Sequence, residues 1–221
     1  MKTSEFYIIR YILERAIERN NITFTEREVA DKLNISQNAV FRAIKKTQQF
    51  GGMAISKSRV VGCRILDYEK LLNYLGSIRN LSEDIVYTTY VPDVGVSKIE
   101  KMLINFGSLS CYSGYTFLFG NDIADYPYIY SYVLPEKISS IKKIFPKKHH
   151  FDNLIILKPD IMLADSMRKK KLSTVSLIQM YIDLWQLKDW QADRFMKKIL
   201  EKITEIYERA DSILYRQGNK K

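Results

Sequence analysis

The chain has 221 residues, of which 46% are hydrophobic and 27% are charged, and its net charge is +10. This length holds one large or two small domains, and the composition excludes a disordered chain. No apolar run approaches the roughly 20 residues that cross a bilayer, and Cys63 and Cys111 lack the spacing of a metal site or a disulfide framework. We therefore expect a cytoplasmic protein with no membrane contact, no metal and no cofactor.

The N-terminal part of the chain has the pattern of three helices. Apolar residues recur at helical spacing over residues 4–19. Thr25 and Glu28 form a capping box, in which each side chain can bond the other residue's backbone N–H, and this predicts a helix that ends near Leu33. After a break of three residues, a third helix is predicted to run to about Phe50.

The residues that follow favour a hairpin on a basic surface. Residues 53–56 and 60–66 have the pattern of two short strands. The stretch 32–66 contains seven basic residues and no acidic one, whereas a solvated surface normally carries both signs. Residues 25–51 resemble the helix-turn-helix of many bacterial and archaeal regulators. The alternative is a small helical bundle with a solvated basic face.

The resemblance implies that residues 1–66 form a winged helix-turn-helix, with the third helix in the major groove of double-stranded DNA. Side chains near the start of that helix are expected to contact base edges, namely Gln37, Asn38, Phe41 and Arg42. The cap, the later lysines and the hairpin turn are expected to contact the DNA backbone, through Ser36, Lys45, Lys46, Lys57 and Arg59. These residues predict a sequence-specific regulator of transcription.

The rest of the chain alternates strands and helices. Residues 67–83 are predicted to form a helical connector, and residues 84–190 a mixed α/β domain. Strands are expected at 85–91, 128–134 and 154–157, and helices at 96–105 and 136–145. The overall fold class is therefore α+β, with an N-terminal winged helix, an α/β domain and a helical C-terminus.

Three segments of this second part carry a further family resemblance. Residues 173–200, STVSLIQMYIDLWQLKDWQADRFMKKIL, are similar to the closing helices of AbiEi-like antitoxins of type IV toxin-antitoxin systems; the shared positions are Gln179, Asp183, Leu184 and Ala192. Residues 111–121 resemble the glycine-containing segment of that family, and residues 153–159 its final strand. The resemblance implies a domain related to nucleotidyltransferases, repression of the protein's own operon and a cognate toxin as partner.

The predicted α/β domain lacks the pattern of an active nucleotidyltransferase. Such an enzyme needs a Gly-Ser pair near a helix start and two carboxylates two residues apart on a strand. Gly107 and Ser108 are present, but Asp122 and Asp125 are three residues apart in a polar turn. We therefore expect a degenerate domain with no catalytic and no metal-binding residues.

Two rival functions remain open. The first is a nucleotidyltransferase or nucleic-acid-processing enzyme that is docked by the winged helix. The second is a plasmid or viral replication or partition protein that binds DNA without controlling transcription. The basic runs at 147–148 and 168–171 and the histidines at 149–150 are expected to be solvated, with contacts to a toxin, RNA or flanking DNA as the alternative.

Residues 191–221 are predicted to form a C-terminal helix with a basic tail. Its apolar residues are spaced by four and three, as in a coiled-coil seam: Ala192, Met196, Ile199, Ile203, Ile206, Ala210 and Ile213. This pattern fits a homodimer formed through the helix. It fits packing of the helix on its own chain equally well.

Overall fold

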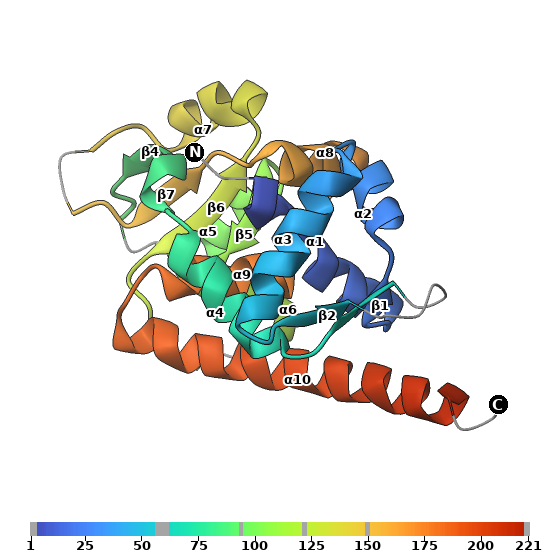
Figure 1. Ribbon diagram of the computed structural model, residues 1–221. Helices are drawn as coiled ribbons and strands as arrows, with labels where there is room; N and C mark the ends of the chain where they lie inside the picture. The colour runs from blue at the N-terminus through green and yellow to red at the C-terminus, as the bar shows by residue number, and fades with distance from the viewer. Residues whose placement is uncertain (1–3, 56–61, 93–94, 121–122, 149–150, 219–221) are drawn as a thin grey trace. The chain divides into compact units, whose positions relative to one another are not determined.

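The computed structural model shows a protein of mixed α and β structure that divides into two compact units (Figure 1). It describes residues 4–55, 62–92, 95–120, 123–148 and 151–218, with side chains up to residue 212. Unit 1 comprises residues 1–79 and 198–221, and unit 2 comprises residues 80–197. Most of the predicted connector and most of the C-terminal helix thus belong to unit 1.

Unit 1 contains four helices from the N-terminal part of the chain: α1 (Ser4–Arg19), α2 (Glu26–Leu33), α3 (Gln37–Gln49) and α4 (Tyr68–Ile78). The predicted ends of the first three are confirmed to within about one residue, because each has a clear apolar stripe or a capping residue. Most of the apolar side chains of the four helices are buried, and the fully buried ones include Phe6, Ile9, Leu13, Val29, Val40, Ile44, Leu71 and Leu75.

A three-stranded antiparallel sheet completes this part of unit 1. Its strands are β1 (Thr23–Phe24), β2 (Met53–Ile55) and β3 (Cys63–Ile65), in the order β1-β3-β2. Cys63 pairs with Phe24 on one side and with Ile55 on the other. Both predicted hairpin strands are confirmed over these residues, and the second is shorter than predicted. Strand β1 was missed because two residues are too few to show an alternating pattern.

The C-terminal helix α10 (Trp190–Gly218) contributes its later turns to unit 1. The ring of Tyr207 stacks on Tyr68 with centroids 4.5 Å apart, and the Tyr68 hydroxyl donates to Thr204 Oγ1 at 2.7 Å. Of the predicted coiled-coil seam, Ala192, Ile199, Ile203 and Ala210 are buried, and Met196 and Ile206 are half-buried. The described part of the seam is therefore already covered within the chain.

Unit 2 is built on a four-stranded mixed sheet. Its strands are β4 (Ile85–Thr89), β5 (Gly107–Ser110), β6 (Ile129–Val133) and β7 (Leu154–Leu157), in the order β4-β7-β6-β5. The central pair β6 and β7 is parallel, and both outer pairs are antiparallel. The three predicted strands are confirmed. Strand β5 was missed, because its small and polar residues have low strand propensity.

Helices cover both faces of this sheet. They are α5 (Val96–Leu103), α6 (Cys111–Phe119), α7 (Ile138–Ile144), α8 (Ile161–Lys169) and α9 (Leu177–Trp185). Because side chains alternate along a strand, Ile129 and Val133 of β6 join a core with Ile99 and Ile141 of α5 and α7. Tyr132 points to the opposite face and reaches α9. Helix α8 was not predicted, and it contains the start of the basic run 168–171.

Candidate nucleic-acid interface

The turn between α2 and α3 positions the start of α3. Asn34 ends α2 in the left-handed conformation, with φ 53°, and the backbone N–H of Ile35 bonds the carbonyl of Ala30 at 3.1 Å. Two residues later, the Ser36 hydroxyl accepts a hydrogen bond from the N–H of Ala39 at 3.2 Å. These bonds satisfy the free ends of both helices, so the two helices meet at a short, well-defined turn.

The residues predicted to contact base edges share the exposed side of α3. Gln37, Asn38, Phe41 and Arg42 are all exposed, and 38% of the Phe41 surface is accessible to solvent. The opposite side of the helix is buried through Val40, Ala43, Ile44 and Thr47. This amphipathic arrangement holds α3 against its own core and leaves a polar face of amide, guanidinium and aromatic groups toward solvent.

Lys45 extends the same exposed face. Its amine lies 5.8 Å from the centroid of the Phe41 ring, a cation–π contact that covers part of the aromatic surface. Among the described residues, Lys32, Arg42 and Lys45 have no ion-pair partner. Their positive charges are thus available for phosphate groups.

Lys46 is held differently from Lys45. Its amine pairs with Glu5 of α1 at 3.0 Å and lies 5.3 Å from the ring of Tyr74. Tyr74 and Glu5 both raise the pKa of the Lys46 amine. The predicted contact between Lys46 and DNA would therefore have to replace an existing ion pair.

Two of the seven basic residues in the stretch 32–66 thus form ion pairs with acidic residues from other parts of the chain. Arg64 on β3 pairs with Asp211 of α10, as Lys46 pairs with Glu5. Both carboxylates lie outside the acid-free stretch, and the sequence pattern contained no signal for either pair. The predicted backbone contacts Lys57 and Arg59 lie outside the described residues.

A buried ion pair fixes α1 to α2 behind this surface. The guanidinium of Arg15, which is 6% exposed, binds both carboxylate oxygens of Glu28 at 2.8 Å and also donates to the carbonyl of Thr23 at 2.9 Å. Arg19 pairs with the same carboxylate. Thr25 caps α2 as predicted, through the N–H of Glu28. The prediction that the Glu28 side chain also bonds the backbone N–H of Thr25 was wrong, because Arg15 and Arg19 bind the Glu28 carboxylate instead.

The charge of Glu28 is stabilised by these contacts. Partial burial alone raises the pKa of Glu28, but the hydrogen bond and charge of Arg15, together with the charge of Arg19, outweigh it and lower the pKa below the ordinary value. The ionised carboxylate thus holds two cationic side chains of α1 and ties α2 to α1.

In unit 2, Gly107 and Ser108 do not form an open phosphate site. Both are fully buried in β5, and the Ser108 hydroxyl donates to the carbonyl of Leu172 at 2.8 Å. A Cβ atom at Gly107 would lie 2.0 Å from the carbonyl oxygen of Tyr132, so glycine is needed for the pairing of β5 with β6. Asp125 is exposed, and Asp122 lies outside the described residues.

Gln179 and Asp183, from the segment 173–200, belong to a buried polar cluster. The carboxylate of Asp183, with no exposed surface, accepts hydrogen bonds from Ser110 at 2.9 Å and from Tyr132 at 2.8 Å. Its other oxygen accepts from the amide of Gln179 at 2.9 Å. Each donor lies on α9, β5 or β6, so the cluster ties α9 to the sheet. We call these four residues the Asp183 cluster.

No family model, curated protein or solved structure matches this chain. Function is therefore argued from the geometry of the two units. Within the part of the chain that the structure describes, no three His, Cys, Asp or Glu side chains gather in a way that would hold a metal ion. None of the described helices combines the length and the apolar character needed to cross a membrane.

Proposed function

We propose that unit 1 is a winged helix-turn-helix that binds double-stranded DNA sequence-specifically, and that the protein regulates transcription. The observation that carries the proposal is the exposed face of α3, where Gln37, Asn38, Arg42 and Lys45 lie opposite the buried face. Amide groups can bond adenine and a guanidinium can bond guanine, each through two hydrogen bonds. The chain order α1, β1, α2, α3, β2 and β3 supports this proposal, because a winged helix has two strands after its third helix.

We further propose that the protein is the antitoxin of a toxin-antitoxin pair and represses its own operon from the cytoplasm. The support is the resemblance of residues 111–121, 153–159 and 173–200 to AbiEi-like antitoxins. In this proposal unit 2 is a degenerate nucleotidyltransferase-like domain that makes contacts and performs no catalysis. The occupied hydroxyl of Ser108 favours that reading over a transferase.

The DNA-binding proposal is tested by selection from a random library of duplexes with the full-length chain. We expect one enriched sequence motif. Arg42→Ala is expected to bind this motif about 5–150-fold more weakly, a loss of about 1–3 kcal/mol, and to relax the preference at one base pair. Lys45→Ala is expected to weaken binding to all duplexes equally and to flatten the dependence on salt.

The matched control is Lys101→Ala, which removes one exposed lysine from α5 of unit 2. It should leave the affinity and the motif unchanged. Equal losses for Arg42→Ala and Lys45→Ala on selected and scrambled duplexes would contradict base recognition by α3.

For the antitoxin proposal, duplexes from the region upstream of the protein's own reading frame should compete as strongly as the selected motif. A lack of such competition would contradict autoregulation but not DNA binding.

A further inference from the structure

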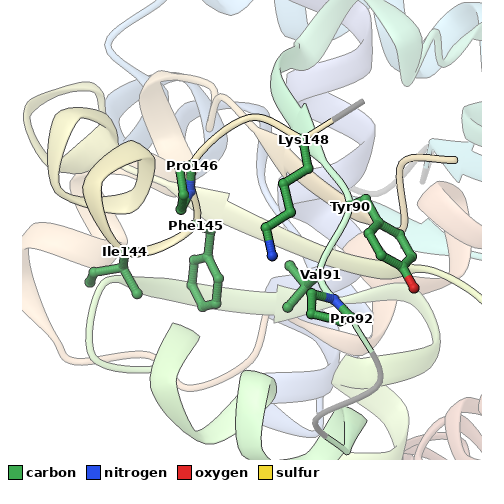
Figure 2. A pocket seen from close by; sticks show the side chains of 7 residues that line it. All are labelled: Tyr90, Val91, Pro92, Ile144, Phe145, Pro146 and Lys148. Carbon is green, nitrogen blue, oxygen red and sulfur yellow. The ribbon is translucent and has the colours of Figure 1, made fainter. Parts of the chain in front are cut away.

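Unit 2 contains a pocket of about 230 Å³ between the end of β4 and the end of α7. Figure 2 shows the side chains of Ile144, Phe145 and Pro146 on one side of it and those of Val91, Pro92 and Tyr90 on the other. Val91 and Phe145 belong to the buried core of the unit. Five of the seven lining side chains are apolar, and the pocket opens to solvent next to the exposed Lys148.

The walls of the pocket are held in place by bonds between β4 and the segment that follows α7. The Tyr87 hydroxyl donates to the carbonyl of Phe145 at 2.6 Å, and the Thr89 hydroxyl donates to the carbonyl of Pro146 at 2.9 Å. The same Thr89 oxygen accepts from the backbone N–H of Lys148 at 3.1 Å. These three bonds join β4 to residues 145–148 and so fix the walls of the pocket.

Lys148 supplies a positive charge at this apolar surface. Figure 2 shows its side chain extending toward Phe145 and Val91, with the amine at the pocket. The neighbouring Lys147 is engaged elsewhere, with Asp152 at 2.7 Å and with the carbonyl of Thr88 at 2.9 Å. Lys148 makes no ion pair with any described residue, and none of the described residues that line the pocket carries a carboxylate. An ammonium beside an apolar wall attracts an anion that has an apolar body.

We propose that this pocket binds a small carboxylate that carries a single apolar ring. Its volume lies below the roughly 300–1,000 Å³ of sites for drug-sized ligands, so the ligand is no larger than a substituted phenylacetate. One ammonium matches one negative charge, whereas a phosphate dianion is usually held by several donors. The site lies wholly in unit 2 and does not depend on the function proposed for unit 1.

The proposal is tested with the full-length chain by ligand-observed ¹⁹F NMR. The probe is 4-fluorophenylacetate, and 4-fluorophenylacetamide is the neutral probe of similar shape. We expect saturable binding of the acid that is about tenfold tighter than that of the amide, because a charge-assisted hydrogen bond adds roughly that factor. Lys148→Met should remove the difference between the two probes, and Lys148→Arg should retain most of it.

Two further variants separate the pocket from general attraction by a basic surface. Lys143→Met removes an exposed lysine of α7 that does not line the pocket, and it should leave both affinities unchanged. Ile144→Ala removes part of the apolar wall and should weaken binding of the acid and the amide alike. The absence of saturable binding of the acid, or an effect of Lys143→Met equal to that of Lys148→Met, overturns the proposal.

Discussion

The two units use their polar side chains in opposite ways. On α3 of unit 1, amide and cationic groups point to solvent, and Arg42 and Lys45 have no ion-pair partner among the described residues. In unit 2, the Asp183 cluster is buried and its groups bond one another. Tyr112 is also turned inward, where it donates to Asp189 at 2.6 Å while Asp189 caps the start of α10.

This difference separates exposed polar residues, which are candidates for contacts with a partner, from buried polar residues that hold the fold. Gln179 and Asp183 are among the residues on which the antitoxin proposal rests. In the structure, they tie α9 to β5 and β6. A polar residue at such a position is explained by packing, because a buried polar group must find a partner within the protein. The polar groups on the exposed face of α3 meet solvent, and the DNA-binding proposal would give them a partner.

The largest effect is expected from Tyr207→Ala in unit 1. The change removes a buried ring that stacks on Tyr68, and a loss of about 3–5 kcal/mol in the free energy of unfolding is typical for a large aromatic residue. Hydrogen exchange by mass spectrometry should show faster exchange in α1 and α4 and little change in α9.

The control for this prediction is Tyr207→Phe. It keeps the ring and loses only a long hydrogen bond to the carbonyl of Leu13, of 3.4 Å, so its cost should stay below about 1 kcal/mol. Faster exchange of equal size in both units after Tyr207→Ala would mean that they unfold together.

Asp183→Ala is the corresponding change in unit 2. It leaves the donors on Ser110, Tyr132 and Gln179 without their acceptor, and each such buried group costs about 1–3 kcal/mol. We expect unit 2 to lose at least about 3 kcal/mol in hydrogen-exchange measurements. Asp125→Ala removes an exposed carboxylate from the same unit and should cost almost nothing. A small effect of Asp183→Ala would contradict the structural role of the cluster.

Glu28→Gln tests the ion pair behind α3 through its dependence on pH. The pKa of Glu28 is lowered by folding, so the carboxylate stabilises the folded state above the ordinary pKa of 4.5, and this stabilisation is lost as the pH falls through the lowered value. The free energy of unfolding of the wild type should exceed that of Glu28→Gln by about 1–2 kcal/mol at neutral pH.

Urea denaturation from pH 7 to pH 3 measures this difference between the two proteins. It should shrink steadily below about pH 4.5. A difference that is independent of pH would show that Glu28 contributes through packing and not through its charge. Glu26→Gln, a change in the first turn of the same helix, is the control.

The sequence predicted the elements of unit 1 well because their signals are local. Thr25 and Ser36 cap α2 and α3 through residues three positions away, and the apolar stripes need only neighbouring turns. In unit 2, Leu154–Leu157 was predicted correctly from a short apolar run. These features depend on backbone geometry over a few residues, which a single sequence contains.

The misses depend on residues that are far apart in the chain. Arg15 binds Glu28 over 13 residues, Lys46 binds Glu5 over 41, and Arg64 binds Asp211 over 147. No local pattern distinguishes these partners from solvated charges. Strand β5 was missed for the same reason, since Gly107–Ser110 becomes a strand through its pairing with β6. The sequence therefore predicted which side of α3 is exposed but not which of its cations are free.

Glu5→Gln should give the smallest effect, and it tests that last distinction directly. Glutamine keeps an oxygen that can accept from Tyr74 but removes the charge that holds Lys46. If the freed amine reaches a phosphate, DNA binding becomes roughly two- to fivefold stronger and the salt dependence steeper by about one counterion.

Glu69→Gln is the matched control, because it removes the same charge from an exposed position on α4. It should strengthen binding less and leave the salt dependence nearly unchanged. An unchanged salt dependence after Glu5→Gln would show that Lys46 stabilises the fold and does not contact DNA. Lys45 would then be the only lysine on the described part of α3 that contacts the DNA backbone, since Lys46 is the only other lysine of that helix.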